Sequence, residues 1–79
     1  MSTTIKILGP GCVKCQRTFN NAVEAVRQLK IQADVQKVED IEELLKYNII
    51  ATPVLMINDQ IQIKGRVAEV YEIVNILQS

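Results

Sequence analysis

The sequence contains no histidine and no tryptophan, and its aromatic residues are limited to two tyrosines and one phenylalanine. The absence of histidine removes the commonest metal ligand and the commonest general base of proteins. With so few aromatic side chains, the core has to be built from Ile, Val, Leu and Ala. Apolar residues nevertheless make up 48% of the chain, which is ordinary for a folded α/β protein and argues against disorder.

The chain has no excess charge of either sign. Nine basic and nine acidic residues give a formal charge of zero, so the basic footprint by which proteins bind nucleic acid is missing. No apolar segment approaches the length of a membrane span, and the first residues, MSTTIKIL, lack the basic-then-apolar pattern of a signal peptide. We therefore expect a cytoplasmic protein that contacts neither nucleic acid nor membrane.

The length of 79 residues suits one domain, residues 1–79, close to the lower limit at which a single core is sufficient. Cysteine occurs only twice, at positions 12 and 15. In a reducing compartment, two thiols at this spacing are typical of a catalytic or metal-binding pair rather than of a permanent disulfide.

Local patterns predict four strands and three helices. Short β-branched or alternating segments that end at Gly, Pro or Asn-Asp predict strands, and apolar residues at three- and four-residue steps predict helices. The expected strands cover residues 3–8, 33–38, 53–57 and 60–64, and the expected helices cover 12–29, 41–47 and a last segment from 67 to 77. The expected buried face of the first helix consists of Cys15, Phe19, Ala22, Val23, Val26 and Leu29. Asp40, with Glu43 three residues later, predicts the N-cap of the second helix.

The resulting order, β-α-β-α-β-β-α, predicts an α/β fold with a four-stranded mixed sheet flanked by three helices, which cover both faces. Parallel neighbours need a helical crossover, whereas the last two strands need only a tight turn at Asn58-Asp59. The cysteines fall at the first strand-to-helix junction. In open α/β sheets, functional sites collect at such positions, beyond the carboxyl ends of the strands.

The stretch LGPGCVKCQ, residues 8–16, favours a redox pair. Cys12 stands at the expected helix start, where unpaired backbone N–H groups and the helix dipole stabilise a thiolate. Lys14 adds a nearby positive charge that favours the same ionised form. Cys15 follows one turn later on the apolar face, so the two sulfurs can meet. This arrangement predicts Cys12 as the attacking thiol and Cys15 as the resolving thiol of a disulfide exchange.

Other functions could use the same two residues. A C-x-x-C pair can bind Cu(I) or supply half of a tetrahedral zinc site, so a Cu(I)- or Zn-binding carrier is the main alternative. Copper-chaperone-like domains run β-α-β-β-α-β and end on a strand, whereas this chain is expected to end on a helix. A non-catalytic binding domain with a vestigial motif, or two buried small apolar residues, are the remaining interpretations.

A second motif, IIATPVLMI at residues 49–57, places Thr52-Pro53 at the start of an apolar strand. Together with the upstream C-x-x-C, it resembles the thioredoxin superfamily. In order along the chain, IKILGPGCVKC, VEDIEELLKY, ATPVLMIND and KGRV resemble the small thioredoxin- and glutaredoxin-like redox-active disulfide proteins of bacteria and archaea. The resemblance implies a thioredoxin-like fold, thiol–disulfide exchange by Cys12 and Cys15, and a cis Pro53 that faces them. It also implies that the Thr52 backbone pairs with an extended substrate segment.

We expect a monomeric electron-transport enzyme without a bound cofactor or metal, which acts on disulfides of proteins or small molecules. A thioredoxin-reductase-like partner is favoured over glutathione, because KGRVAE offers only Gly65 where glutaredoxins have a Gly-Gly pair and an acid. Lys6 stands where thioredoxins hold a buried Asp that accepts the proton of the resolving thiol, so the proton acceptor for Cys15 is not assigned. Asp59 replaces a Gly common in the hairpin turn, which costs turn stability.

Overall fold

The computed structural model describes residues 3–11, 13–48 and 51–78. Its elements are β1 (Thr3–Leu8), α1 (Val13–Leu29), β2 (Ala33–Val38), α2 (Ile41–Lys46), β3 (Val54–Ile57), β4 (Gln60–Lys64) and α3 (Val70–Gln78). The predicted order of elements is confirmed, and the bounds of β1, β2 and β4 are those expected from the sequence. The last helix begins at Val70, three residues later than expected, because the segment before it is used to contact α1.

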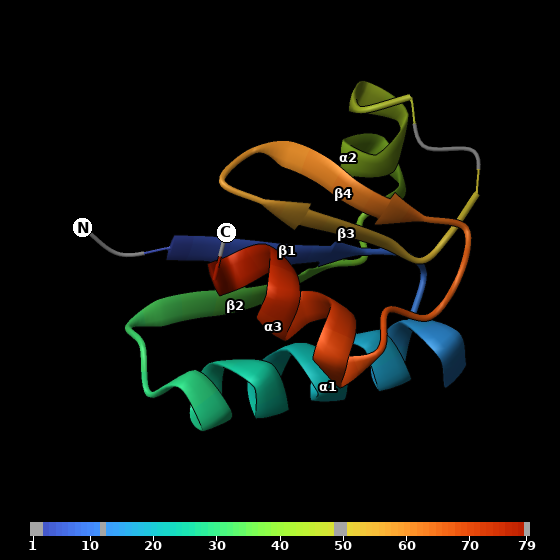
Figure 1. The fold of residues 1–79 in the computed structure, drawn as a ribbon. Helices are drawn as coiled ribbons and strands as arrows, with labels where there is room; N and C mark the ends of the chain where they lie inside the picture. Colours follow the sequence, from blue (N-terminus) through green and yellow to red (C-terminus); the bar gives the residue numbers. More distant parts are fainter. Residues whose placement is uncertain (1–2, 12, 49–50, 79) are drawn as a thin grey trace.

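The four strands form one mixed sheet in the order β2-β1-β3-β4, in which β1 pairs with β2 in parallel and the other neighbours are antiparallel. Figure 1 shows α1 and α3 on one face of this sheet and α2 on the other. The predicted four-stranded mixed sheet with helices on both faces is therefore confirmed. The central position of β1 places its carboxyl end, and the loop that follows it, at the middle of one sheet edge.

Alternation along the strands divides the buried side chains between two cores. Ile5 and Ile7 of β1 point to the face covered by α1 and α3, whereas Leu8 packs with Leu44 of α2 on the other face. All four residues of β3 are buried, as expected for a strand that is covered on both sides. The larger core contains Ile5, Ile7, Ala22, Ala25, Leu55, Ile57, Ile63, Ala68 and Ile73.

The buried face of α1 differs in part from the predicted one. Its buried residues are Cys15, Thr18, Ala22 and Ala25, and Phe19, Val26 and Leu29 flank them as half-buried residues. The prediction was wrong for Val23, which is 44% exposed. The sequence pattern also missed Thr18. A polar threonine is not expected in a buried position, and Thr18 is buried because its hydroxyl has hydrogen-bond partners inside the protein.

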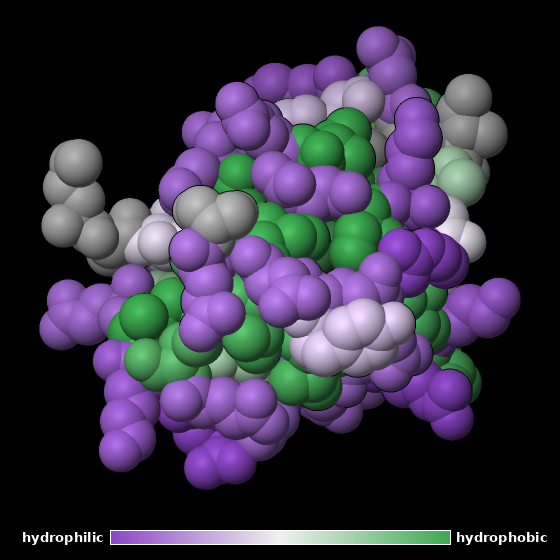
Figure 2. Space-filling view, viewed as in Figure 1, coloured by the Kyte–Doolittle hydropathy of each residue, from purple (hydrophilic) through white to green (hydrophobic). Residues whose placement is uncertain are grey.

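The second helix begins as predicted. Asp40 is its N-cap, and the Asp40 side chain accepts a hydrogen bond of 2.9 Å from the backbone N–H of Glu42. None of the helices among the described residues has the length and apolar character that a membrane crossing requires. Figure 2 shows hydrophilic side chains over most of the face that carries α3, with small apolar patches between them.

Candidate functional site

Cys15 is the third residue of α1, and only 5% of its surface is exposed. Its side chain lies over Gly9, in the loop between β1 and α1. A Cβ atom at position 9 would overlap the Cys15 sulfur and would lie 3.5 Å from the Cβ of Thr52. Cys15 and Thr52 therefore approach Gly9 together, although 36 residues of chain separate them. The structure brings together these two predicted site residues.

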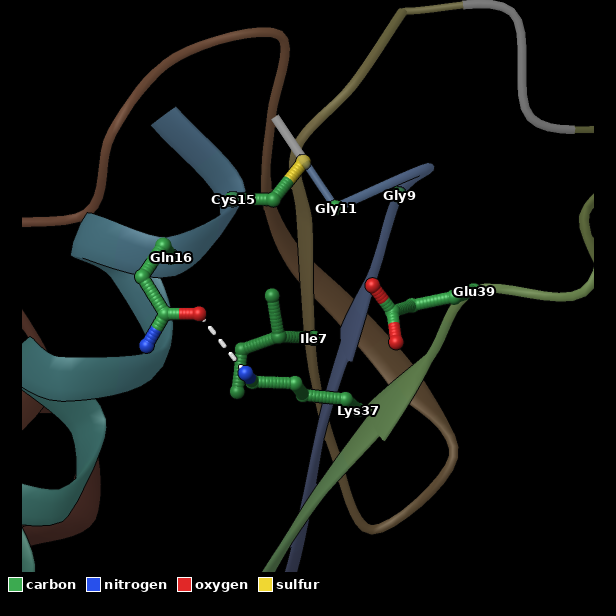
Figure 3. A pocket seen from close by; sticks show the side chains of 7 residues that line it. All are labelled: Ile7, Gly9, Gly11, Cys15, Gln16, Lys37 and Glu39. Atoms are coloured by element: carbon green, nitrogen blue, oxygen red, sulfur yellow. Dashed lines mark hydrogen bonds between the residues drawn. The ribbon is translucent and has the colours of Figure 1, made fainter. Parts of the chain in front are cut away.

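Cys15 also borders a small pocket at the edge of the sheet (Figure 3). The residues that line this pocket are Ile7, Gly9, Gly11, Cys15, Gln16, Lys37 and Glu39. They come from the end of β1, the loop after it, the first turn of α1, the end of β2 and the residue that follows β2. The pocket offers about 10 Å³ to the centre of a water molecule, which is about the space that one water needs.

The charged residues of the pocket come from β2 and the residue after it. Ile7 of β1 is paired in register with Lys37 of β2, so both side chains point to the face that carries α1. Lys37 Nζ donates a hydrogen bond of 2.7 Å to Gln16 Oε1 and lies 4.7 Å from the ring centroid of Phe19, a cation–π contact. These contacts hold the ammonium against α1, at the side of the pocket.

Glu39 follows β2 at the same edge, and its carboxylate lies against Gly11, where a Cβ atom would overlap Glu39 Oε2. Gly11 has a φ of 87°, which a residue with a side chain rarely adopts. Gln16, Lys37 and Glu39 were not predicted as site residues from the sequence. The parallel pairing of β1 with β2 was the available signal, because it carries the carboxyl ends of both strands to one edge.

Two lysines singled out from the sequence lie elsewhere. Lys6 is paired with Met56, which belongs to the core on the α2 face, and its ammonium lies 3.7 Å from the Asp59 carboxylate. Lys6 thus points away from the face that carries Cys15. Lys14 is exposed on α1 and is not among the residues that line the pocket. Cys12, the predicted attacking thiol, lies outside the described residues.

The Thr52–Pro53 peptide bond is cis, the isomer that the resemblance implies. Pro53 is buried, and its carbonyl accepts a hydrogen bond of 2.9 Å from the backbone N–H of Gly65. This bond continues the β3–β4 pairing up to the loop that approaches Gly9. Thr52 itself is half-buried, so part of this residue is accessible from the protein surface at the sheet edge.

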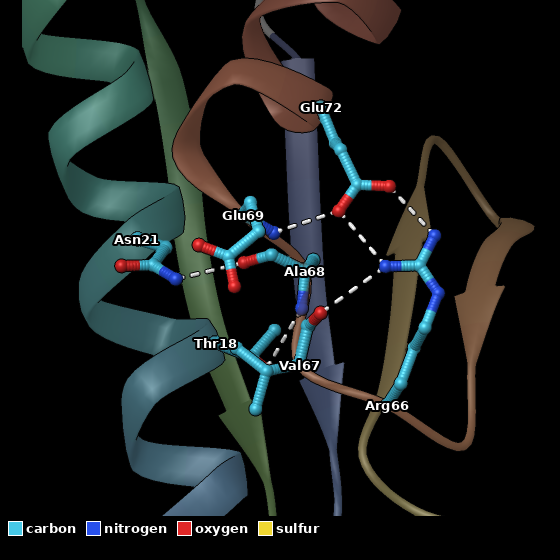
Figure 4. Close-up of polar contacts among 7 residues, drawn as sticks. All are labelled: Thr18, Asn21, Arg66, Val67, Ala68, Glu69 and Glu72. Carbon is cyan, nitrogen blue, oxygen red and sulfur yellow. Dashed lines mark hydrogen bonds and ion pairs between the residues drawn. The ribbon is translucent and has the colours of Figure 1, made fainter.

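The segment between β4 and α3 fixes the half of α1 that carries Cys15 (Figure 4). Thr18 Oγ1 accepts a hydrogen bond of 3.4 Å from the backbone N–H of Ala68 and donates one of 3.0 Å to the carbonyl of Lys14. Asn21 Nδ2 donates a bond of 2.8 Å to the carbonyl of Ala68. Two side chains of α1 therefore satisfy both backbone groups of a buried residue that precedes α3.

The start of α3 has its own polar anchor. Both terminal nitrogens of Arg66 bond to the Glu72 carboxylate, at 2.8 and 2.6 Å, and the backbone N–H of Glu69 donates to the same carboxylate at 3.1 Å. The bonds from Arg66, and then the one from Glu69, lower the pKa of Glu72 to about 2. A glutamate that bonds back to the residue before the helix forms half of a capping box.

No group of three or more His, Cys, Asp or Glu side chains that could hold a metal ion is found among the residues described by the structure. The Cu(I)- or Zn-binding alternative therefore gains no supporting observation from this part of the chain. The polar groups near Cys15 are an ammonium, an amide and a carboxylate, and they suit proton transfer and charge stabilisation.

Known proteins resemble almost the whole chain. A family model described as a thioredoxin domain matches residues 3–78. A thioredoxin of Methanothermobacter thermautotrophicus is 40% identical over 73 residues, which cover 92% of this chain and 95% of the relative. A thioredoxin of Methanocaldococcus jannaschii is 37% identical over 75 residues, covering 95% of this chain and 86% of the relative. The chain therefore belongs to the thioredoxin family.

Proposed function

We propose that this protein is a thiol–disulfide oxidoreductase that works through the dithiol pair Cys12 and Cys15. The observation that carries the proposal is the position of Cys15. It is nearly buried in the first turn of α1, and its sulfur lies on Gly9 beside Thr52. Membership of the thioredoxin family supports the same class of reaction.

The proposed reaction has two exchange steps. The Cys12 thiolate attacks one sulfur of a substrate disulfide, a mixed disulfide forms, and the other substrate sulfur leaves as a thiolate. Cys15 then loses its proton, attacks the Cys12 sulfur and releases the second substrate thiolate. The substrate gains two electrons, and the protein keeps a Cys12–Cys15 disulfide. A reductase returns these electrons, and the cycle needs no bound cofactor.

Substrate binding is proposed to occur at Thr52 and Pro53. An extended substrate segment would pair with the Thr52 backbone, as an added strand, and present its disulfide toward the cysteines. The closeness of the Thr52 side chain to Gly9 and Cys15 supports this site. Lys14, exposed near the start of α1, is proposed to favour the Cys12 thiolate through its charge.

The direct test uses single cysteine substitutions with a protein disulfide, such as that of insulin, and with glutathione disulfide as substrates. Cys12→Ser should abolish turnover, whereas Cys15→Ser should accumulate a mixed disulfide that mass spectrometry detects. These are the only cysteines of the chain, so the adduct is assigned without ambiguity. A Cys15→Ser variant that turns over like the parent protein would contradict the dithiol mechanism.

Two further measurements identify the electron donor and separate the alternative. Re-reduction of the oxidised protein by a thioredoxin reductase with NADPH, but not by glutathione, is the expected result. The Cu(I) or Zn alternative predicts a different result. The protein would then retain the metal against a competing chelator and would form no disulfide in a redox buffer.

A further inference from the structure

We infer that Glu39 is the proton acceptor of Cys15 in the second exchange step. The inference rests on the proposed function, because it concerns the step in which Cys15 resolves the mixed disulfide. The need for an acceptor follows from burial. Cys15 is 5% exposed, and burial away from water disfavours the ionised form of a thiol. A thiolate has to form at this position before it can attack.

Cys15 and Glu39 line the same pocket and approach one short loop at neighbouring glycines. The Cys15 sulfur lies in the space where a side chain of Gly9 would be, and the Glu39 carboxylate lies in the corresponding space at Gly11. Only Pro10 separates the two glycines. Figure 3 shows the Glu39 carboxylate reaching from the loop after β2 toward the pocket that Cys15 borders.

The pocket offers no other suitable base. Of its lining residues, only Lys37 and Glu39 carry a charge. A lysine ammonium has donors but no acceptor, and the amide of Gln16 is not a base. The contact of Lys37 with Gln16 and Phe19 keeps its positive charge beside the pocket, where a cation favours the ionised form of a nearby thiol.

The other charged groups near this edge are directed elsewhere. Asp40, the next residue, uses its carboxylate to cap α2 through the backbone N–H of Glu42. Lys6 of β1 points to the opposite face of the sheet and pairs with Asp59. Lys14 is exposed on α1, and it is a cation. Position 6, where thioredoxins have the Asp that accepts this proton, holds a lysine here. Glu39 supplies the carboxylate instead.

The step is a proton transfer followed by an exchange. The Cys15 proton passes to the Glu39 carboxylate through the one water molecule for which the pocket has room. The resulting thiolate attacks the Cys12 sulfur, the new Cys12–Cys15 bond forms, and the bond to the substrate breaks. The substrate leaves as a thiolate that takes a proton from solvent, and Glu39 returns its proton to solvent.

The test resolves the two exchange steps with 5,5′-dithiobis(2-nitrobenzoate), whose coloured thiol is released once in each step. At a high reagent concentration, the first release precedes a slower second release that does not depend on that concentration. Glu39→Gln should leave the first phase within about twofold of the parent rate and slow the second by about a hundredfold, the lower end of general-base effects. Glu39→Asp, which keeps a carboxylate, should give an intermediate rate.

The pH profile of the second phase separates a base from a structural role. With Glu39 as base, the parent rate should change little between the ionisation of a carboxyl and that of a thiol, roughly pH 5.5 to 8. In Glu39→Gln the rate should rise about tenfold per pH unit over this range, because the thiolate then forms only by exchange with solvent. Loss of the negative charge alone would instead favour the thiolate and speed this phase.

The matched control is Glu42→Gln, which removes an exposed carboxylate of α2 that does not line the pocket; it should leave both phases unchanged. A second phase in Glu39→Gln with the parent rate and the parent pH profile would overturn the role of Glu39 and leave the dithiol mechanism standing. A parent protein that shows no second phase would overturn the proposed function, and the role of Glu39 with it.

Discussion

The sulfur of Cys15 occupies the space that a side chain at position 9 would fill, so any residue other than glycine at position 9 would force the sulfur or the loop to move. Gly9 is not required for its backbone freedom, because its φ lies outside the left-handed region, unlike those of Gly11 and Gly65. The requirement is one of space: the loop after β1 passes directly beneath the first turn of α1.

Gly9→Ala should therefore lower the free energy of unfolding by about 1–3 kcal/mol, the usual cost of overpacking, and should slow the resolution of a mixed disulfide. Urea unfolding measures the first effect. The control is the same substitution in a Cys15→Ala background, where the overlapping sulfur is absent. There the added methyl group should cost less than about 1 kcal/mol, since the remaining neighbours, Cβ of residue 15 and Cβ of Thr52, lie at 3.4 and 3.5 Å. Equal costs in both backgrounds would show that the sulfur is not the obstacle.

Thr18 links the start of α1 to the segment before α3, and its hydroxyl should matter more than its methyl group. Thr18→Val keeps the shape but leaves the N–H of the fully buried Ala68 without this acceptor. We expect a loss of about 1–3 kcal/mol in the free energy of unfolding. Thr18→Ser, which keeps the hydroxyl, should lose less. Chemical denaturation measures the free energy of unfolding of both variants. If Thr18→Val is more stable than Thr18→Ser, the hydroxyl is not the important group.

The Arg66–Glu72 anchor predicts a pH-dependent contribution to stability. Folding lowers the pKa of Glu72 to about 2, from an ordinary value of 4.5. The folded state therefore gains stability from the ionised carboxylate above about pH 4.5, and loses this gain as the pH falls toward 2. Glu72→Gln should have a lower thermal midpoint than the parent protein at pH 7, and the difference should disappear near pH 2.

The control for this experiment is Glu69→Gln, which removes the same charge from the same helix end. The Glu69 side chain has no hydrogen bond to Arg66, and only its backbone N–H contacts Glu72. Its substitution should change the midpoint less at pH 7. A Glu72→Gln deficit that stays constant from pH 7 to pH 2 would mean that the ionised carboxylate is not what stabilises the start of α3.

Local patterns predicted the elements well, since strand ends here coincide with strong local signals. β1 ends before Gly9-Pro10-Gly11, and the β3–β4 turn is the expected Asn58-Asp59. The start of α3 was placed too early because Val67 fits the apolar spacing of a helix. The backbone N–H and carbonyl of its neighbour Ala68 instead form hydrogen bonds with Thr18 and Asn21 of α1. These are tertiary contacts, which the spacing of apolar residues along the chain cannot predict.

The candidate site was predicted only in part, for a similar reason. Cys15 and Thr52 carry their own sequence signals, and the structure brings them together at Gly9. Lys37 and Glu39 looked like ordinary polar residues at the end of an alternating strand. Their place beside Cys15 depends on the register of β2 against β1, which sets Lys37 opposite Ile7. A site residue whose role comes from strand pairing is visible only once the pairing is known.

In the β3–β4 turn, glycine should stabilise the protein more than the residue present, Asp59. Asn58 and Asp59 both have positive φ, 51° and 68°, as a type I′ turn requires, and glycine is preferred at the second position. Asp59 has a compensating contact, its ion pair with Lys6 at 3.7 Å, but 80% of the Asp59 side chain is exposed. Exposed ion pairs contribute about 0–1 kcal/mol, less than or similar to the cost of a left-handed non-glycine residue.

Asp59→Gly should therefore raise the free energy of unfolding slightly, by about 0.5 kcal/mol at physiological salt. Removing the backbone strain at this positive φ should outweigh two losses: the ion pair with Lys6 and the greater entropy that glycine gives the unfolded chain. Asp59→Asn separates the two effects, because it removes the charge and keeps a side chain that tolerates this conformation. The step from Asp to Asn measures the pair with Lys6 and should shrink in 1 M salt. The step from Asn to Gly measures the backbone and should not respond to salt. If Asp59→Gly is less stable than Asp59→Asn at both salt concentrations, the turn does not carry the expected strain.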